Sequence, residues 1–485
     1  MSVNIVQEIV ERRKADIAER GFSFGFEIPS KRTRPVVPFM QEKGAILEVK
    51  RASPSKGDIA PGLDSVKTAL EYRKNGAKAI SCLTEEIYFK GSLKDLMAIT
   101  SAIDDVAVLR KDFLIDEQEI EISYLCGADA VLLICGILSN EKLLSMTAKC
   151  HELGIRALVE VRTEDDAEKV LSVKKVYPDT IVCGVNSRNL KDFTIDLLVP
   201  AMLKEKLGGS VIFESGITTQ ECAQMIGRMG FKGILLGEFA ARNPQMAGVF
   251  VKAFTTTSED AQGRFYIKLA QKIMEHKKQN PYKPMVKICG LTQKEDIELA
   301  VKLGADFTGF ILAPGFARNI YGERFQALKE SLSSIKNVIK IGVITDPASQ
   351  EAKFALSLVE QGLLDCLQFH GIKYQALPQE FKNVPHYFAL TGKEGISKEE
   401  AEKLNSYGYA RYLQDNGSHN YAENCGAPLW LAGGVNPQNV RELIDKFHPE
   451  LVDVSSGLED AIPEKTGIKN HQKMIDFFLE INKEE

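Results

Sequence analysis

Several features that mark large classes of protein are absent from this sequence. No apolar run approaches the length needed to cross a bilayer. The sequence has no CxxC pair, no HExxH, no Walker loop and no GxGxxG fingerprint. Because these patterns are the usual signs of a bound metal, nucleotide or dinucleotide, we expect no metal and no cofactor.

A concentration of charge of one sign is also missing. The chain has 61 Lys and Arg against 66 Asp and Glu, a net charge of -5, and its basic residues are scattered. Nucleic-acid surfaces and membrane-seeking faces need clustered positive charge, so we expect small molecules as partners, and neither nucleic acid nor membrane. The 44% hydrophobic and 26% charged residues are typical of a soluble globular protein with an ample core.

Nine cysteines occur singly, and most of them lie inside apolar runs. An odd number without metal-ligand spacing fits reduced thiols in the cytoplasm, where disulfides are rare. The first twenty residues carry Ile5, Ile9 and Ile17 at helical spacing among charges. This segment therefore predicts an amphipathic helix ahead of the first domain, and not a secretion signal.

The strongest organisational signal is a unit in which a short apolar run is followed by an amphipathic helical segment. In the first half, eight such runs begin at Gly44, Ala77, Val106, Ala128, Ile155, Thr180, Ser210 and Lys232. Most are apolar on both faces, as parallel strands covered by helices are. Eight strand–helix units predict a closed barrel, whereas six would predict an open sheet.

The second half repeats this pattern. Its eight runs begin at Met285, Phe307, Ile339, Leu364, His386, Ala410, Pro428 and Leu451. We therefore predict an α/β protein made of two tandem (β/α)8 TIM barrels, with domains at 1–256 and 257–485. Residues 257–284 form a helical stretch that prolines end, and it either connects the barrels or opens the second one.

Polar residues follow the strands of the first predicted barrel at the ends where TIM barrels carry their chemistry. Six strand ends contribute Glu48 and Lys50, Lys111, Glu160, Asn186 and Arg188, Glu214 with Ser215 and Gly216, and Gly237. Taken singly, each of these residues fits a structural ion pair better than a catalytic role. Their presence on six strand ends favours an active site.

The turns after the seventh and eighth strands stand where TIM barrels bind phosphate through backbone N–H groups. In the second half these turns contain Gly433–Gly434 and Ser456–Gly457. Both barrels are therefore predicted to take a phosphorylated substrate.

Two other residues of the second half lie at strand ends. Cys289 lies beside a glycine near a helix N-terminus, a position that lowers a thiol pKa, whereas the other cysteines fit buried structural residues. Asp415 precedes Asn-Gly, and in that context an aspartate is ordinarily a turn residue.

Motifs of the first half resemble one family. The segments EVKRASPSKG, LTEEIYFKGS, LRKDF, LVEV, GVNSRNLKDFTID, ESGI and LLGEF occur in this order over roughly the first 250 residues. This pattern resembles indole-3-glycerol-phosphate synthase, which closes the indole ring of carboxyphenylaminodeoxyribulose phosphate (CdRP) with loss of CO2 and water. The resemblance implies that Lys111, with a lowered pKa in a cationic mouth, is the general acid at the sugar carbonyl.

The same resemblance implies roles for further residues. Glu160 would transfer protons during dehydration. Lys50 would bind the substrate carboxylate, with Glu48 orienting it, and Asn186 and Glu214 would bind the sugar hydroxyls or assist proton transfer. The substrate phosphate would be bound by Ser55, Arg188, Gly216 and Gly237, and the aromatic pocket would be lined by Phe89 and Phe113.

Motifs of the second half resemble another family. KICGLT, QFHG, LAGGVNP and VDVSSGLE are similar to phosphoribosylanthranilate isomerase from about residue 285 onward. That family performs an Amadori rearrangement of an aminoribose to an aminoketose. The resemblance implies that Cys289 is the base at C2 and Asp415 the acid at the ring oxygen. By the same resemblance, Arg318 would bind the anthranilate carboxylate, and Gln368 and His370 would shape the site. The phosphate would be bound by Gly433, Gly434, Ser456 and Gly457.

The second half departs from its family in two places. The usual Gly-Gly-Thr/Ser-Gly run after the catalytic Asp is replaced by NGSHNYAENCG, and the usual Lys-Asp near the end is Lys469-Asn470. The altered loop leaves open an alternative in which the second barrel is a degenerate binding or structural domain. An isomerase of another phosphosugar is a second alternative. The two implied reactions are consecutive, and the order resembles fused bifunctional enzymes, which are usually monomers.

Overall fold

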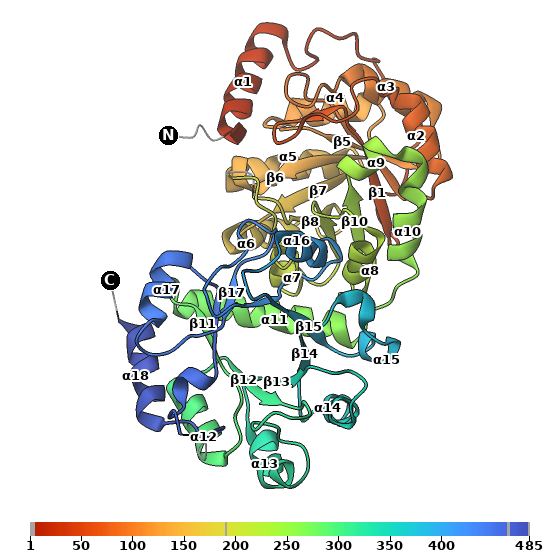
Figure 1. Cartoon of the computed structure of the whole chain (residues 1–485). Coiled ribbons are helices and arrows are strands. Elements are labelled where there is room, and N and C mark those ends of the chain that lie inside the picture. Colours follow the sequence, from red (N-terminus) through yellow and green to blue (C-terminus); the bar gives the residue numbers. More distant parts are fainter. Residues whose placement is uncertain (1–4, 190–191, 463–465, 484–485) are drawn as a thin grey trace. The chain divides into compact units, whose positions relative to one another are not determined.

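The computed structural model describes residues 5–189, 192–462 and 466–483. The chain divides into two compact units, Met1–Glu259 and Asp260–Glu485. Each unit is built from alternating strands and helices (Figure 1). The helix expected near the N-terminus begins at Ile5, and residues 1–4 of that prediction lie outside the described residues.

In the described part of the first unit, eight parallel strands close into a barrel in the order β1-β10-β9-β8-β7-β6-β5-β4. They are β1 (Gly44–Val49), β4 (Ala79–Leu83), β5 (Ala107–Lys111), β6 (Ala130–Ile134), β7 (Arg156–Val161), β8 (Ile181–Asn186), β9 (Val211–Glu214) and β10 (Gly233–Leu236). Each lies inside one of the predicted apolar runs, so the first barrel is confirmed. Because the strands are parallel, their carboxyl ends form one mouth.

The helices of this barrel begin with one ahead of its first strand, and the others follow the strands. They are α1 (Ile5–Arg20), α2 (Ser65–Lys74), α3 (Leu93–Ala102), α4 (Glu117–Leu125), α5 (Asn140–Glu152), α6 (Glu164–Lys174), α7 (Val199–Lys204), α8 (Gln220–Arg228), α9 (Glu238–Arg242) and α10 (Ala247–Thr255), with short 3-10 turns η1 (Cys135–Ile137) and η2 (Pro244–Met246). A short antiparallel hairpin of β2 (Ala52–Ser53) and β3 (Gly57–Asp58) follows β1. Capping boxes at Asp116 and Thr163 fix the starts of α4 and α6 by satisfying free backbone N–H groups.

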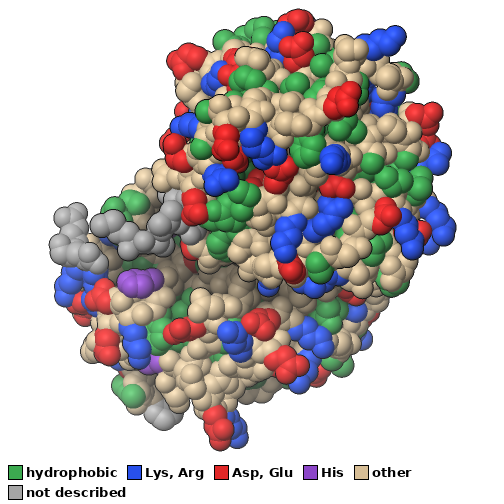
Figure 2. All heavy atoms as spheres, turned by 90° about the horizontal axis from the view of Figure 1, so that it is seen from above, with side chains coloured by type: hydrophobic (Ala, Val, Ile, Leu, Met, Phe, Trp, Pro, Cys, Tyr) green, Lys and Arg blue, Asp and Glu red, His purple; other side chains and the backbone are tan. Residues whose placement is uncertain are grey.

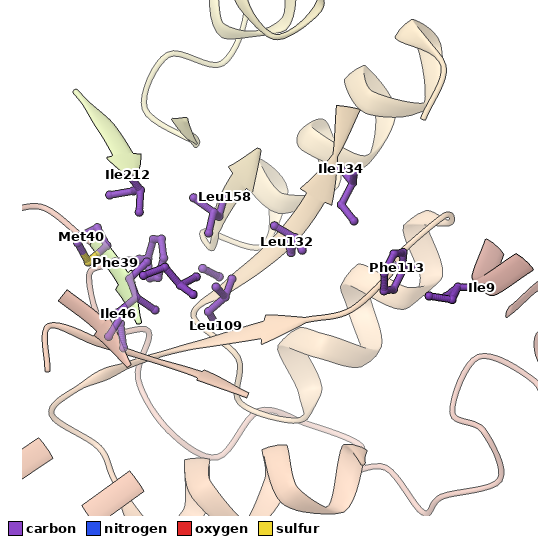
Figure 3. Close-up of a cluster of buried hydrophobic side chains, with 14 residues drawn as sticks. Ile9, Phe39, Met40, Ile46, Leu109, Phe113, Leu132, Ile134, Leu158 and Ile212 are labelled. Atoms are coloured by element: carbon purple, nitrogen blue, oxygen red, sulfur yellow. The ribbon is translucent and has the colours of Figure 1, made fainter. Parts of the chain in front are cut away.

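The core of the first barrel is a cluster of buried aliphatic and aromatic side chains (Figure 3). Leu109, Leu132 and Leu158 come from three adjacent strands, and each is at most 3% exposed. Ile9 of α1 and Phe113, just after β5, belong to the same cluster. The N-terminal helix is therefore packed into the barrel through its apolar face.

Arg13 ties the same helix to the end of β5. Its guanidinium Nη1 is 2.7 Å from Asp112 Oδ1, and its Nε donates to Glu119 Oε1 at 2.7 Å. Asp112 also accepts hydrogen bonds from Thr84 and Arg110. Since Asp112 stands between Lys111 and Phe113, this buried network fixes the backbone that carries both residues.

The second unit is also a closed barrel, with eight parallel strands within its described residues in the simple order β11 to β18. They are β11 (Met285–Ile288), β12 (Phe307–Ile311), β13 (Ile339–Ile344), β14 (Cys366–His370), β15 (His386–Thr391), β16 (Leu413–Asp415), β17 (Trp430–Ala432) and β18 (Leu451–Val454). The second barrel is therefore confirmed as well, and its strands fall inside the predicted runs.

The helices of the second barrel begin with one ahead of its first strand. They are α11 (Ala261–Gln279), α12 (Lys294–Leu303), α13 (Glu323–Ser334), α14 (Gln350–Glu360), α15 (Gln379–Lys382), α16 (Lys398–Ser406), α17 (Val440–Phe447) and α18 (His471–Asn482), with η3 (Tyr374–Ala376) and η4 (Ser456–Leu458). Gln262 of α11 forms two hydrogen bonds with the backbone of His386, at 3.0 and 2.7 Å. Helix α11 therefore packs onto the second barrel and is its first element, ahead of β11.

On the face seen in Figure 2, basic and acidic side chains are interspersed. In the described residues no helix is long and apolar enough to span a membrane.

Candidate active sites

A buried cluster of carboxylates and ammonium groups occupies the mouth of the first barrel. Lys50 Nζ lies 2.8 Å from Glu48 Oε1, and Lys111 Nζ lies 3.0 Å from Glu48 Oε2. Lys111 Nζ also lies 3.5 Å from Glu214 Oε2. These residues come from the ends of β1, β5 and β9, so the barrel joins strand ends that are far apart in the sequence.

The charges of the cluster control one another. Burial raises the pKa of Glu48, but Lys111 and Lys50 outweigh that effect and hold the pKa at about 2. Burial lowers the pKa of Lys111, and the charges of Glu48, Glu214 and Glu160 raise it above its usual value. The expected lowered pKa of Lys111 is therefore wrong, because carboxylates, and not other cations, are its dominant neighbours.

Glu214 and Glu160 are the carboxyl groups that keep a proton most readily. Burial raises the pKa of Glu214 to about 8, although Lys111 acts in the opposite direction. Burial also raises the pKa of Glu160, with Lys111 and a hydrogen bond from Asn186 opposing the change. Both carboxyl oxygens of Glu214 lack a hydrogen-bond partner in the part of the chain that the structure describes. A buried carboxyl with this pKa can hold a proton near neutral pH.

Two glycines make room for these charged groups. A Cβ atom at Gly184 on β8 would lie 2.1 Å from Glu214 Oε1. A Cβ atom at Gly237 would lie 2.8 Å from Glu48 Oε1 and 3.3 Å from Lys50 Nζ. Gly237, which the sequence assigned to phosphate, thus also leaves space for the pair of Glu48 and Lys50.

We expect Glu214→Gln to stabilise the first barrel at alkaline pH. The unfolded chain ionises this carboxyl near pH 4.5, whereas the folded chain keeps the proton until about pH 8. The stability that the proton gives is full below pH 4.5 and is lost as the pH rises toward 8. Since Gln cannot ionise, the variant should match wild type near about pH 4 and exceed it by roughly 5 kcal/mol near about pH 9.

Urea unfolding followed by circular dichroism from acid to alkaline pH measures this difference. The fluorescence of Trp430, the single tryptophan, reports the second barrel and serves as an internal reference. Glu121→Gln is the matched control because Glu121 is exposed. An equal gain at acid and alkaline pH would show that Glu214 does not hold its proton in the folded chain.

Aromatic residues line the same mouth. The rings of Phe89 and Phe113 lie with centroids 6.1 Å apart, and Lys50 Nζ lies 5.9 Å from the Phe89 ring. The carboxylate of Glu85 accepts three backbone N–H groups of residues 87–89, which fixes the loop that carries Phe89. The two predicted pocket residues are thus brought together next to the charged cluster.

The residues assigned to phosphate lie on the turns after β1, β8, β9 and β10. Ser215 and Gly216 have φ angles of 69° and 79°, so the turn after β9 holds two successive residues in the left-handed region. Arg188 donates to Phe193 O at 3.4 Å within its own loop. Ser55 lies in the turn between β2 and β3. Arg188 and Ser55 thus both lie on loops, and neither residue joins the charged cluster among the described contacts.

The first barrel contains supporting residues that the sequence did not single out. Ser81 Oγ lies 3.5 Å from Glu48 Oε2, and Arg162 Nη1 donates to Asn186 O at 2.7 Å. Ser81 lies in the middle of β4, where the register pairs it with Glu48, and Arg162 directly follows β7. A test of every polar residue at an inward position of each strand would have found Ser81, because alternation places it on the same face as Leu83 and Ala79.

In the second barrel, Cys289 lies directly after β11 and is 7% exposed. Gly309 on the neighbouring strand makes room for it, since a Cβ atom there would lie 2.7 Å from the sulfur. Burial raises the pKa of the Cys289 thiol, and the Lys287 ammonium opposes the change. The expected lowered pKa is therefore wrong for the substrate-free chain, because loss of water outweighs the nearby cation.

A hydrogen-bonded chain runs from Lys287 through Gln368 to His370, whose ring faces the Asp415 carboxylate. Lys287 Nζ lies 2.6 Å from Asp453 Oδ2 and donates to Gln368 Oε1 at 2.8 Å. Gln368 Nε2 lies 3.3 Å from His370 Nδ1, and His370 Nε2 lies 3.8 Å from Asp415 Oδ2. The side chain of Gln368 has one orientation, because an ammonium group can only donate and must face the amide oxygen.

Arg318 is held by an acidic residue of the same barrel. Its Nε and Nη2 both donate to the Glu459 carboxylate at 2.7 Å, and Lys469 Nζ donates to the same carboxylate at 2.8 Å. Burial raises the pKa of Glu459, but Arg318 and Lys469 lower it to about 2. Glu459 therefore fixes the orientation of the Arg318 guanidinium and occupies the edge formed by its Nε and Nη2.

The two predicted phosphate turns of the second barrel lie against each other. Gly433 and Gly434 have φ angles of 96° and 66°. A Cβ atom at Gly457 would lie 1.9 Å from Val435 O, so only glycine allows this approach of the two turns. Asn470 caps α18 by accepting from Lys473 N, and an aspartate could do the same, so this departure from the family leaves the cap intact.

The site residues that the sequence did not single out in the second barrel are Lys287, Asp453, Glu459, Lys469 and Tyr387, whose hydroxyl donates to Gln368 Oε1 at 2.7 Å. Lys287 and Asp453 are charged residues inside apolar strands, where an unpaired charge would be costly. A charged residue inside an apolar run was therefore a usable signal in the sequence, since each such residue needs a partner of opposite charge. Nothing in the linear sequence pairs Glu459 with Arg318.

Two closed parallel barrels, each with acid–base groups and glycine turns at the carboxyl ends of its strands, define a tandem TIM-barrel enzyme. Residues 6–252 match the family model described as indole-3-glycerol phosphate synthase, and residues 286–480 match that of N-(5'-phosphoribosyl)anthranilate isomerase. The chain belongs to the indole-3-glycerol phosphate synthase family. A phosphoribosylanthranilate isomerase domain follows the synthase domain in the same chain.

Known proteins are similar to the whole chain and to each barrel. A multifunctional tryptophan biosynthesis protein of Schizosaccharomyces pombe is 30% identical over 94% of this chain, which spans 64% of that protein's length. An indole-3-glycerol phosphate synthase of Bacillus mycoides is 36% identical over 51% of this chain and 96% of its own. The solved phosphoribosyl anthranilate isomerase of Thermus thermophilus is 30% identical over 41% of this chain and 98% of its own, with a TM-score of 0.34.

Proposed function

We propose that this chain catalyses two consecutive steps of tryptophan biosynthesis. The second barrel isomerises N-(5-phosphoribosyl)anthranilate to CdRP, and the first barrel converts CdRP to indole-3-glycerol phosphate with loss of CO2 and water. The observation that carries the proposal is the cluster of Lys111, Glu48 and Glu214 in the first mouth, inside a region that matches the synthase family.

In the first barrel, Lys111 acts on the sugar carbonyl. Its raised pKa keeps it an ammonium ion, which donates to the carbonyl oxygen while an aromatic ring carbon attacks the carbonyl carbon. Lys50 holds the substrate carboxylate, and Glu48 orients Lys50 through their ion pair. Phe89 and Phe113 hold the aromatic ring of the substrate.

The later steps need proton carriers. Loss of CO2 returns an electron pair to the ring and restores its aromaticity, so this step needs no cofactor. Loss of water then needs a proton on the leaving hydroxyl and a base for a carbon-bound proton. Glu160 and Glu214 suit these transfers, because burial raises the pKa of both carboxyls toward the working pH.

In the second barrel, Asp415 donates a proton to the ring oxygen of the aminoribose, and Cys289 as thiolate removes the proton from C2. Burial raises the pKa of the Cys289 thiol, and the Lys287 ammonium opposes this change and so favours the thiolate. Arg318 takes the anthranilate carboxylate, and the two glycine turns take the phosphate. The match of residues 286–480 to the isomerase family does not support the alternative of a degenerate second domain, and it favours this isomerase over that of another phosphosugar.

We also propose that the chain works as a monomer in the cytoplasm. Each charged cluster is built from side chains of a single barrel of one chain, so neither needs a second copy. All nine cysteines lie within the described residues as free, buried thiols, which suits a reducing compartment.

A paired assay on the purified chain tests the proposed function. One arm supplies phosphoribosylanthranilate and follows the loss of anthranilate fluorescence, and the other supplies CdRP and follows indole absorbance. We expect turnover in both arms. Failure of the CdRP arm would overturn the assignment of the first barrel, and failure of the other arm alone would overturn that of the second.

A further inference from the structure

The loop that departs from the isomerase family, residues 416–426, is a folded segment. Asn416 Oδ1 accepts from the backbone N of Ser418 and of Asn420, both at 3.0 Å. The backbone N of His419 donates to Asn416 O at 3.0 Å. These bonds close a tight turn over 416–420 directly after Asp415.

His419 holds an unusual backbone conformation in this turn. Its φ angle is 56°, in the left-handed region that residues other than glycine seldom adopt. The conformation places its ring Nε2 3.0 Å from the carbonyl oxygen of Gly433. Since a carbonyl oxygen can only accept, Nε2 must carry the proton and donate it.

The Gly433–Gly434 turn lies directly against this loop. A Cβ atom at Gly433 would lie 2.5 Å from the backbone carbon of Asn416, and one at Gly434 would lie 3.3 Å from His419 Nε2. Gly433 and Gly434 both have positive φ angles. Because a pair of glycines turns its shared peptide plane at little cost, this turn needs contacts from outside to keep one orientation.

Loop 416–426 supplies such contacts to two successive peptide planes. The Ala432 carbonyl accepts from Tyr421 OH at 2.8 Å and from the backbone N of Asn416 at 3.1 Å. The Gly433 carbonyl accepts from His419. In a trans peptide the N–H of the next residue points opposite to the carbonyl. Holding these two carbonyls therefore directs the N–H groups of Gly433 and Gly434 away from the loop.

The carbonyl of Gly434, the next one in the turn, is held by two asparagine side chains that follow it in the sequence. Gly434 O accepts from Asn439 Nδ2 at 2.9 Å and from Asn436 Nδ2 at 3.2 Å. Three successive carbonyls, those of residues 432–434, are thus fixed by side chains or by the neighbouring turn. Successive N–H groups fixed in this way form the kind of concave site that binds phosphate.

We infer that His419 is a positioning residue for the substrate phosphate of the second barrel, acting by locking the Gly433–Gly434 peptide through its carbonyl. The altered loop thereby replaces a glycine-rich segment with a rigid support for the phosphate turn. The kinetic part of this inference rests on the proposed isomerase function. The binding part concerns only phosphate and this turn.

Two substitutions at His419 separate positioning from general folding. Asn tolerates the left-handed backbone but is too short to reach Gly433 O, so His419→Asn removes only the bond. Gln carries an amide nitrogen at the same distance from Cβ as the ring Nε2, so His419→Gln restores the donor. We expect His419→Asn to raise the isomerase KM about five- to tenfold, with kcat within about twofold of wild type. His419→Gln should stay within about twofold of wild type in both constants.

A second readout does not depend on turnover. Inorganic phosphate should slow hydrogen–deuterium exchange in residues 430–436 of wild type and His419→Gln, and the phosphate concentration needed should rise about five- to tenfold in His419→Asn. Equal phosphate protection in wild type and His419→Asn would overturn the inference, even in a chain with no isomerase activity. Loss of isomerase activity in wild type with the phosphate effect intact would overturn only the proposed function.

Discussion

Lys111→Met should abolish indole formation while leaving isomerisation within about twofold of wild type. Removal of a positioned general acid typically costs roughly 100- to 10,000-fold in rate, and Met keeps most of the side-chain volume. The carboxyl groups of Glu48 and Glu214 both lose their contact with the Lys111 ammonium in this variant. The measurement is kcat for each reaction on the same preparation of the chain.

The matched control for this variant is Lys204→Met. Lys204 is also a buried lysine of the first barrel, 6% exposed, but it lies on α7 and pairs with Glu205. It should leave the indole rate close to that of wild type. A comparable loss from Lys204→Met, or loss of both activities from Lys111→Met, would show a folding defect and would contradict the assignment of Lys111.

Cys289→Ala and Asp415→Ala should give the reverse pattern. Each removes one partner of the proposed acid–base pair, so isomerisation should fall by roughly 100- to 10,000-fold. Indole formation from supplied CdRP should stay within about twofold of wild type, because the residues of the first cluster are untouched. The measurement is again kcat for both reactions in one preparation.

Cys366→Ala is the matched control for the thiol. Cys366 is a fully buried cysteine of β14 in the same barrel, and burial raises its pKa as well. It should keep its isomerase activity. If Cys289→Ala retains wild-type isomerisation, Cys289 is a structural thiol and the base must be another residue of the second mouth.

The order of the elements follows from local sequence. Each barrel strand lies inside an apolar run that the sequence marks, because burial on both faces requires continuous apolar residues. Most of the first site also follows, since polar residues such as Glu48, Lys111 and Glu214 at strand ends converge once the barrel closes. The same reasoning singled out Cys289 of the second barrel, whereas Asp415 gained its predicted role only from the resemblance to the isomerase family.

The ionisation of these residues does not follow from local sequence. A position beside a glycine predicted a lowered pKa for Cys289, and a cationic mouth predicted the same for Lys111. The structure raises the pKa of both groups. A pKa depends on the sum of burial and of charges within a few ångströms, and those neighbours come from distant strands.

By itself, then, the sequence determined two eight-stranded barrels, the strand ends that carry the chemistry and the glycine turns that suit phosphate, because each is a matter of period and spacing along the chain. The tertiary structure alone decided that Glu459 orients Arg318, that Gln368 links Lys287 to His370, and that His419 supports the Gly433–Gly434 turn. The contacts of Glu459 with Arg318, of Gln368 with Lys287 and of His419 with Gly433 join residues that only barrel closure brings within hydrogen-bonding distance, and no local pattern encodes which partner a side chain will meet.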